Sequence, residues 1–503
     1  MSPQWPHAMK ALPNELLILI FNLSIPPEGA TFICSSLPRL FSQAMVLSQV
    51  CSSWRELTLS TGELWDTITI SPVEDEEEGT ILPERPLLLH LERSRRMPLA
   101  ITVSRPFRGL GEKSMSQERF HALLAKNSTR LRHLHLHHLD LLLKVIDLRM
   151  LAHKSARANG SNTDSDIQHT LRFPLLESLS FKAPTGDYNQ LHSLLQRTSF
   201  PSLKSLSILD YTARRPFTQS FSLPYRQIRS LQFRVHEKLI LPLYNSTTLP
   251  EILSSCSFIT KLDLELTANM GYPEALTIPC LTDLTIQLLL TEQAYKGATR
   301  ILSVVICPAL KSLSIRGRPA DNIELTYGFL SRRKIQGDLF KDGIIPLLEK
   351  SNCALDRLNV HKVLVSSSSL MLLLRARACL TLLHLLFREV EIDFLPSPCS
   401  SNLLDQLLAE LVAHPNDPGI PVLPPLRTIH ITMTGSSQTV ASLASIVESR
   451  TESLESAVFE IPDHLAAAAG AVLNNDTPVA VKVLGYPSGS IYVGYENRDG
   501  CLR

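Results

Sequence analysis

The chain has 503 residues, of which 44% are hydrophobic and 19% are charged. This composition supplies enough apolar side chains for one or more large cores and excludes a chain that is disordered throughout. Lys and Arg number 49 against 48 Asp and Glu, a formal net charge of +1, so no overall charge attracts the chain to nucleic acid or to an anionic membrane.

The opening sequence and the cysteines predict an intracellular protein. MSPQWPHAMK has no basic segment followed by an apolar run, and no uninterrupted apolar run approaches the roughly 20 residues needed to cross a bilayer. The nine cysteines are scattered and never spaced as C-x-x-C, which favours neither a zinc cage nor a disulfide framework. We therefore expect reduced, buried thiols, a location in the cytoplasm or the nucleus, and no membrane partner.

The first predicted helix runs from Leu12 to Leu23. Pro13 stands in its first turn, where a helix tolerates proline best, and nearly every residue after it is apolar. A surface helix normally carries a single apolar stripe. A short helix that is apolar on all sides therefore has to pack against two things, its own domain and something else.

A second helix is predicted over residues 47–57, because Leu47, Val50, Trp54 and Leu57 share one helical face. The other elements expected in this region are a helical segment over 59–65, a strand over the alternating residues 67–70, and a long loop over 24–40 between the two helices.

These segments resemble a known family. LPNELLILIF, VLSQVCSSWRELTLST and GELWDTITI are similar to the F-box of basidiomycete-type fungal F-box proteins, in the leading Leu-Pro, the Val-Cys-x-x-Trp-Arg core and the closing Leu-Trp. The following LLLHLERSRRMPLAITV resembles the join that such proteins place before a solenoid. The loop over 24–40 is longer than in most members.

The resemblance implies docking on a Skp-type adaptor, which in turn sits on a cullin scaffold. Leu16, Val50 and Trp54 have a second interpretation, as the core of the three-helix domain, because so small a domain needs most of its apolar residues inside. The adaptor contacts of the family fall on Leu12, Pro13, Glu15, Leu16, Val50, Cys51 and Trp54.

A short phrase, L-x-x-L-x-[L/I/F/V], recurs eleven times after residue 99. The alternation within each copy predicts a strand with one apolar face, and the stretches between copies have the apolar spacing of a helix. One strand with its helix cannot enclose a hydrophobic core alone, so neighbouring repeats must stack to bury their apolar faces. Typical leucine-rich repeats carry Asn or Cys at the ninth position from the start of the phrase, and no copy here does. We therefore expect irregular repeats. The copies begin at Leu131, Leu176, Leu203, Ile228, Ile259, Leu281, Leu310, Leu355, Leu380, Leu426 and Leu454.

The expected fold is therefore α/β: a small N-terminal helical F-box followed by an irregular leucine-rich-repeat-like solenoid with a curved parallel β-sheet and outer helices. Acidic residues 74–78 and several prolines favour a solvated linker after the helices. The expected regions are 1–70 (F-box domain), 71–98 (acidic, proline-containing linker), 99–485 (solenoid) and 486–503 (C-terminal tail).

Side chains between the apolar positions of each phrase should form the inner face of the sheet and hold a protein client. Their polar character favours an extended polar client segment over a small apolar ligand. Loops 153–170 and 396–402 are the alternative client contacts, because loops often carry function. The residues expected to contact the client are Arg132, His133, His135, Lys261, Asp263 and Glu265.

No motif predicts catalysis. The chain lacks G-x-S-x-G, H-E-x-x-H and G-x-x-x-x-G-K-[ST]. The histidines of LRHLHLHHL have a single carboxylate close in sequence, Asp140, and no Cys or Glu, so we expect neither a metal nor a cofactor. The leading hypothesis is a non-enzymatic substrate-recognition subunit of an SCF-type cullin-RING ubiquitin ligase. The alternatives are a leucine-rich scaffold that binds the adaptor without delivering clients and, from another class, a hydrolase in an irregular α/β fold.

Overall fold

The structure is a computed structural model of the chain. It describes residues 12–26, 28–34, 39–72, 84–104, 117–137, 142, 144–148, 171–182, 198–211, 224–235, 248–266, 275–289, 292–318, 339–361, 363, 372, 382–386, 412, 427–432, 437–451, 454–473 and 479–486. The acidic run at 74–78, both candidate client loops and the tail after residue 486 lie outside these ranges.

The chain divides into two compact units, and each is described by itself. Unit 1 comprises residues 1–213, 219–224 and 498–503, and unit 2 comprises residues 214–218 and 225–497. Each unit combines helices with a mostly parallel sheet, so the α/β class predicted from the sequence is confirmed.

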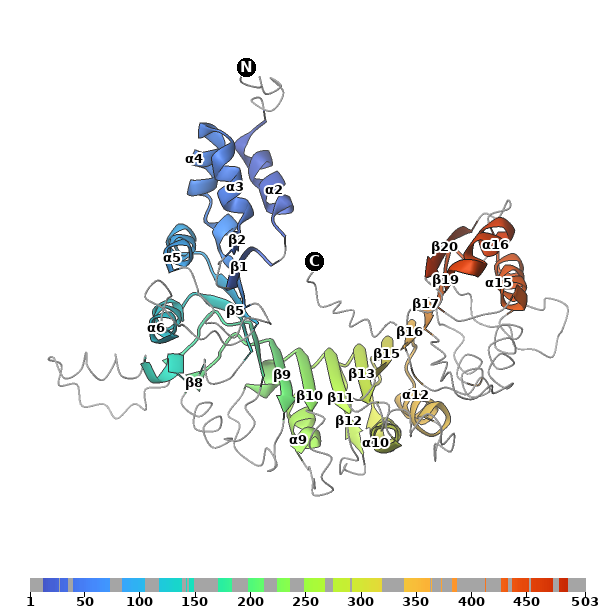
Figure 1. The fold of residues 1–503 in the computed structure, drawn as a ribbon. Coiled ribbons are helices and arrows are strands. Elements are labelled where there is room, and N and C mark those ends of the chain that lie inside the picture. Colours follow the sequence, from blue (N-terminus) through green and yellow to red (C-terminus); the bar gives the residue numbers. More distant parts are fainter. Residues whose placement is uncertain are drawn as a thin grey trace, which may run out of the picture. The chain divides into compact units, whose positions relative to one another are not determined.

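Unit 1 begins with a small helical domain (Figure 1). Its core contains Leu17, Phe21, Leu47, Leu64 and Trp65. The Trp65 indole nitrogen donates to the Thr58 carbonyl oxygen at 2.9 Å, which satisfies the one polar atom of this buried ring. The helices are α2 (Asn14–Ser24), α3 (Gln43–Val50), α4 (Ser52–Ser60) and the 3₁₀-helix η1 (Gly62–Trp65).

The prediction of one continuous helix over 47–57 is wrong, because the chain is extended at Cys51 (φ −157°, ψ 172°). Cys51 ends α3 and begins α4, and its sulfur accepts a hydrogen bond from the Trp54 amide at 3.4 Å. Side chains that bond to nearby backbone N–H groups favour helix starts over helix interiors. The break therefore follows from local bonding that the apolar periodicity does not report.

The long loop expected over 24–40 also contains regular structure. Strands β1 (Ala30–Cys34) and β2 (Arg39–Phe41) pair antiparallel, and β1 pairs parallel with β3 (Thr67–Pro72). Phe32 of β1 is fully buried. The strand expected at residues 67–70 is confirmed as β3, and the sheet of unit 1 begins inside the helical domain.

The sheet of unit 1 has the strand order β2-β1-β3-β4-β5-β7-β9. Its pairs from β1 to β9 are parallel, and Leu99, Ile101 and Val103 of β4 are buried, as period-2 alternation requires. A separate pair joins β6 (Leu171–Arg172) to β8 (Thr198–Ser199). The remaining elements are β4 (Leu99–Val103), β5 (Leu131–Leu136), β7 (Ser178–Lys182), β9 (Ser205–Tyr211), α5 (Glu84–Arg93) and α6 (Gln117–Asn127).

Helix α5 lies inside the segment expected to be a linker. Its Leu87 and His90 are buried. The His90 ring packs against Trp65 and Phe32, with centroid distances of 4.8 and 5.6 Å. This part of residues 71–98 is therefore packed structure, fixed to both the helical domain and strand β1.

Unit 2 contains a parallel sheet with the order β10-β11-β13-β15-β16-β17-β18-β19-β20. Helix α10 packs against β11 and β13 (Figure 1), and β12 (Leu276–Thr277) pairs with β14 (Val305–Ile306). The sheet strands are β10 (Ser230–Val235), β11 (Lys261–Leu266), β13 (Asp283–Leu289), β15 (Ser312–Arg318), β16 (Arg357–His361), β17 (Leu382–Leu386), β18 (Thr428–Thr432), β19 (Ser456–Pro462) and β20 (Ala480–Tyr486). The helices are the 3₁₀-helix η2 (Tyr225–Gln227), α9 (Thr248–Ser255), α10 (Glu292–Val304), the π-helix η3 (Leu339–Ile344), α12 (Ile345–Ser351), α15 (Ser437–Ser449) and α16 (Asp463–Leu473).

Backbone hydrogen bonds join the segments that precede neighbouring strands of unit 2. The amides of Thr282 and Asp283 both donate to the Thr260 carbonyl oxygen, at 2.9 and 3.0 Å. One turn further on, the amides of Lys311 and Ser312 both donate to the Thr282 carbonyl oxygen, at 2.9 Å each. Two adjacent N–H groups thus share one carbonyl oxygen of the preceding strand's turn, and the Thr282 hydroxyl also donates to the Thr260 carbonyl oxygen, at 3.0 Å.

Candidate functional site

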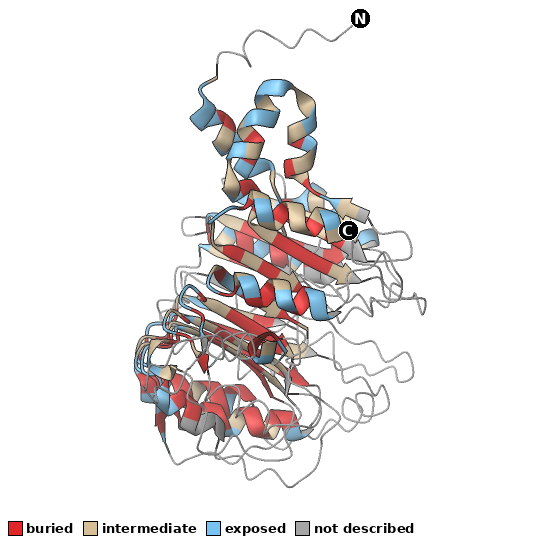
Figure 2. Ribbon diagram, turned by 90° about the vertical axis from the view of Figure 1, so that its left-hand side faces the viewer, coloured by how far each residue is buried: buried red, intermediate tan, exposed pale blue. Residues whose placement is uncertain are grey.

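Helix α2 presents an apolar stripe to solvent. Leu16, Leu19, Ile20 and Leu23 are 47, 55, 47 and 79% exposed, while Leu17 and Phe21 of the same helix are buried. The exposed residues have spacings of three and four, so they form one continuous face, which we call the α2 stripe. Figure 2 shows exposed residues along the helices nearest the N-terminus. Exposed apolar side chains clustered in this way mark an interaction surface.

Two further large apolar side chains of the helical domain are exposed. Val46 lies on α3 and Phe41 on β2, and their exposed fractions are close to that of Leu19. The domain therefore buries its core residues and still leaves apolar area on three of its elements.

The residues predicted from the family pattern on α2 lie in different environments. Leu12 packs partly buried against the helical core. Pro13 is exposed, and its carbonyl oxygen accepts hydrogen bonds from the amides of Leu16 and Leu17 at 3.1 and 3.2 Å. Glu15 is exposed in the first turn, where a carboxylate is favourable beside the helix N-terminus.

Trp54 belongs mainly to the core. Its ring packs edge-on against the buried Phe21, with 4.7 Å between centroids, which fits the core interpretation of this residue. Val50 and Cys51 are half-buried on either side of the helix break. The family pattern did not single out Leu19, Ile20 and Leu23, although the all-apolar sequence of α2 was a signal that more than one face of this helix needs a partner.

The predicted client residues of unit 1 lie on β5. Arg132 and His133 are exposed, and His135 is half-buried. The Glu177 carboxylate forms ion pairs with Arg132 and Lys204, each at 3.3 Å. Desolvation of the ring and then the neighbouring Arg132 charge lower the pKa of His133. Within the described residues, no group of three or more His, Cys, Asp or Glu side chains is arranged to hold a metal ion.

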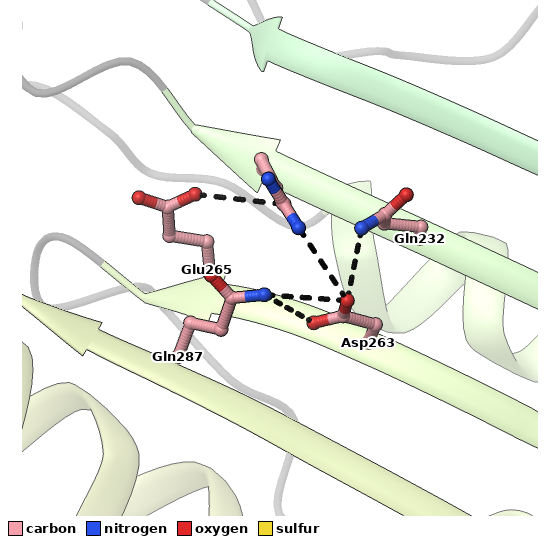
Figure 3. Close-up of polar contacts among 5 residues, drawn as sticks. Gln232, Asp263, Glu265 and Gln287 are labelled. Atoms are coloured by element: carbon pink, nitrogen blue, oxygen red, sulfur yellow. Dashed lines mark hydrogen bonds and ion pairs between the residues drawn. The ribbon is translucent and has the colours of Figure 1, made fainter. Parts of the chain in front are cut away.

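The predicted client residues of unit 2 lie on β11, and two of them, Asp263 and Glu265, form part of a polar cluster (Figure 3). The side-chain amide of Gln232 donates to the Asp263 carboxylate at 2.9 Å, and that of Gln287 donates to both carboxylate oxygens at 3.2 and 3.3 Å. Arg234 lies 4.0 Å from Asp263. Burial raises the pKa of Asp263, and the Arg234 charge and the two amides oppose that rise.

Glu265 departs from the expectation of an exposed inner-face residue. It shares a face with Asp263, but its side chain is only 3% exposed and lies 4.0 Å from Arg234. A buried carboxylate needs a compensating cation, and Arg234 of the neighbouring strand supplies it. Lys261, at the start of the same strand, is exposed. Asp263 and Lys261 are therefore accessible, whereas Glu265 is enclosed.

Comparison with known families finds one match, to the family described as F-box-like, over residues 9–71. The match spans α2, α3, α4, η1 and the strands β1 and β2. The N-terminal region is therefore an F-box-like domain, which supports the assignment of the chain as an F-box protein. A comparison with curated protein sequences finds no match. Among the helices that the structure describes, none has both the length and the apolar sequence required to span a bilayer.

Proposed function

We propose that the chain is a substrate-recognition subunit of an SCF-type cullin-RING ubiquitin ligase. In this role the F-box-like domain binds a Skp-type adaptor, and the repeat region binds a protein client. F-box proteins are generally non-catalytic adaptors, so the chain acts by placing the client and leaves the ubiquitin chemistry to other subunits. The observation that carries the proposal is the α2 stripe, exposed on a domain of this family.

The α2 stripe can supply a substantial part of the free energy of docking. Fully burying one Leu or Ile side chain contributes about 1.5–3 kcal/mol. The four residues of the stripe are already partly buried, so docking gains about half of that for each, on the order of 4 kcal/mol together. This is a substantial part of the roughly 8 kcal/mol that corresponds to micromolar affinity.

The residues carried over from the family take two roles in this proposal. Leu16 contacts the adaptor within the stripe, with Pro13 and Glu15 at its N-terminal end. Leu12 and Trp54 hold α2 in place from the core side. Val50 and Cys51 contact the adaptor at the break between α3 and α4, where both are half-buried.

We place the client contacts on the polar face of the sheet within each unit. The exposed candidates are Arg132 and His133 in unit 1 and Lys261 in unit 2, with half-buried His135 and Asp263 beside them. Holding a client near the charged conjugating enzyme raises the effective concentration of the reacting groups, and this is the whole mechanism of the subunit. The proposed division remains 1–70, 71–98, 99–485 and 486–503, and the proposed location is the cytoplasm or the nucleus.

The proposal is tested by co-expressing the full chain with a Skp-type adaptor and a cullin. We expect the three proteins to co-purify, and we expect bound clients to accumulate when the cullin is inhibited. Failure to bind the adaptor contradicts the proposal. Adaptor binding without any client that depends on the cullin favours the alternative, a leucine-rich interaction scaffold.

A further inference from the structure

The turn that follows helix α5 lies against the F-box-like domain. We call residues 94–98, between α5 and β4, the α5 turn. Gly62 of η1 packs on this turn so closely that a Cβ on Gly62 would stand 2.9 Å from Met97 Cγ and 3.1 Å from the Ser94 carbonyl oxygen. The domain and the turn are therefore in direct contact, with no space between them for a larger side chain.

Arg130 holds the α5 turn from the side of the repeats. It stands directly before β5, the first strand that carries the repeated phrase. Its Nε and Nη2 atoms donate to the Met97 carbonyl oxygen at 3.1 and 3.0 Å, and Nη2 also donates to the Ser94 hydroxyl oxygen at 2.8 Å. Its Nη1 atom donates to the side-chain oxygen of Asn127 at 3.1 Å and to the Leu91 carbonyl oxygen at 3.5 Å. One guanidinium group thus joins the end of α5 to the segment between α6 and β5.

The groups around Arg130 favour its charge. The Leu91 carbonyl oxygen lies in the last turn of α5, where the helix dipole favours a cation. Burial lowers the pKa of Arg130, and the charge of Asp66, directly after η1, opposes that fall. Because arginine stays protonated in proteins, the side chain binds the turn as a cation.

A second connection between the F-box-like domain and the repeats runs through the sheet. Strand β3 pairs in parallel with β4 from Thr67 to Ile70, and the Ala100 amide donates to the Asp66 carbonyl oxygen at 2.9 Å. The twist between two neighbouring strands varies over a range of roughly 25° among proteins, so strand pairing by itself leaves the angle open. The α5 turn, held by Arg130, is a second point of attachment that removes this freedom.

We propose that Arg130 is a positioning residue that fixes the angle between the F-box-like domain and the first repeat strands of unit 1. An arginine suits this role because its rigid fork holds several acceptors at once, which a lysine ammonium on a flexible stem does not. With the angle fixed, a client on the polar face of unit 1 keeps one distance from the adaptor-binding helix, so its lysines approach the conjugating enzyme from a single direction. This use of the fixed angle rests on the proposed function, whereas the angle itself is a property of unit 1.

The test measures the distance between two spin labels in the full chain by pulsed electron spin resonance, both alone and bound to a Skp-type adaptor. The labels are attached to an encoded ketone-bearing amino acid at Glu56 on α4 and at Leu175 before β7, which are both exposed, so the native cysteines stay unchanged. We expect one narrow distance distribution in the chain that retains Arg130. We expect Arg130→Ala to widen it at least about twofold, because domains without a fixed interface move relative to each other, and Arg130→Lys to give an intermediate width.

Arg132→Ala is the matched control. Arg132 is two residues away from Arg130 and forms an ion pair with Glu177, so its loss should leave the distance distribution unchanged. Adaptor binding by Arg130→Ala should equal that of the unchanged chain, which shows that the widening does not come from an unfolded F-box-like domain. If Arg130→Ala does not fold, the width measured for Arg130→Lys decides.

Three results overturn the proposal: a broad distribution in the chain that retains Arg130, an unchanged width in both Arg130 variants, or equal widening in Arg132→Ala. Loss of adaptor binding by the chain that retains Arg130 contradicts the proposed function instead. The distances measured on the chain alone still decide the role of Arg130 in that case, so the two failures are distinguishable.

Discussion

Gly29 lies so close to Thr67 that a Cβ on Gly29 would stand 2.2 Å from the Thr67 carbonyl oxygen. Its φ of +65° is a conformation that side chains other than glycine rarely adopt. The same turn is held by the Thr69 hydroxyl, which donates to the Glu28 carbonyl oxygen at 2.9 Å. Gly29 thereby fixes strand β1 of the F-box-like domain beside β3.

Gly29→Ala is expected to destabilise unit 1. The left-handed conformation alone costs about 1–2 kcal/mol for an alanine, and the clash with backbone adds to it, so we expect a loss of at least about 2 kcal/mol. Denaturant unfolding followed by tryptophan fluorescence measures it, because all three tryptophans, Trp5, Trp54 and Trp65, lie near the N-terminus. Glu28→Ala, which keeps the acceptor carbonyl, is the control and should change little. Equal effects of the two variants would contradict this role of Gly29.

The repeated phrase predicted most of the strands. LRHLHL at Leu131 is strand β5, and the later phrases up to Leu454 each contain or precede a strand of the sheet. The reason is that alternation is a local signal, present in each phrase by itself. Strands β1 and β2 carry no such phrase, and β1 is fixed by pairing with β3, about forty residues further along the chain. Sequence reasoning therefore took them for a loop.

The sequence did not show which side chains of the candidate site are exposed, for a related reason. A helix that is apolar on all sides does not reveal which face its own domain covers, so the family pattern pointed to Trp54, while the structure exposes Leu19 and Leu23. Glu265 is enclosed, and its carboxylate lies 4.0 Å from Arg234 of the neighbouring strand. Such a pairing depends on register between strands, which the sequence of one strand does not contain.

The double variant Leu16→Glu and Ile20→Glu should abolish adaptor binding while the domain stays folded. Both side chains are about half exposed, so charges there remain solvated in the free chain but would be buried without a partner in the complex. Pull-down of the adaptor and a melting curve measure the two effects. Val472→Glu, equally exposed on α16 of unit 2, should leave adaptor binding intact. Full adaptor binding by the double variant would remove the α2 stripe from the interface.

Trp54→Ala should also lose the adaptor, but by unfolding the helical domain. Its ring packs against Phe21 and is partly buried against the core, so we expect a cost below that of truncating a fully buried Trp, which is about 3–5 kcal/mol. Trp54→Phe keeps an aromatic contact and should recover most of the adaptor binding. If Trp54→Ala loses the adaptor with an unchanged unfolding midpoint, Trp54 contacts the adaptor directly instead.

Unit 1 should lose stability in mild acid. Burial lowers the pKa of both His90 and His121 to about 4, whereas an unfolded histidine titrates near 6.5. Well above pH 6.5 both histidines are neutral in the folded and in the unfolded state, so the free energy of unfolding is at its highest. Between pH 6.5 and 4 only the unfolded state takes up the protons, so stability falls by about 1.4 kcal/mol per pH unit for each histidine. Unfolding curves at several pH values measure this slope, and His90→Leu should remove about half of it. An unchanged slope in that variant would contradict the assignment to His90.

Arg234→Met should destabilise unit 2 more than the loss of a surface arginine does. The substitution removes the guanidinium group that lies 4.0 Å from the Glu265 carboxylate, whose side chain is only 3% exposed. Removing one partner of a buried pair costs about 3–5 kcal/mol. Because Arg234 itself is 24% exposed, we expect the lower end, about 3 kcal/mol. Arg316→Met, exposed on the same face, should cost less than about 0.5 kcal/mol. Adding Glu265→Gln to Arg234→Met removes the buried carboxylate charge and should recover much of the loss. Thermal unfolding of the unchanged chain, Arg234→Met, Glu265→Gln and the double variant measures this as a double-mutant cycle. Additive effects in that cycle would mean that Arg234 does not stabilise Glu265.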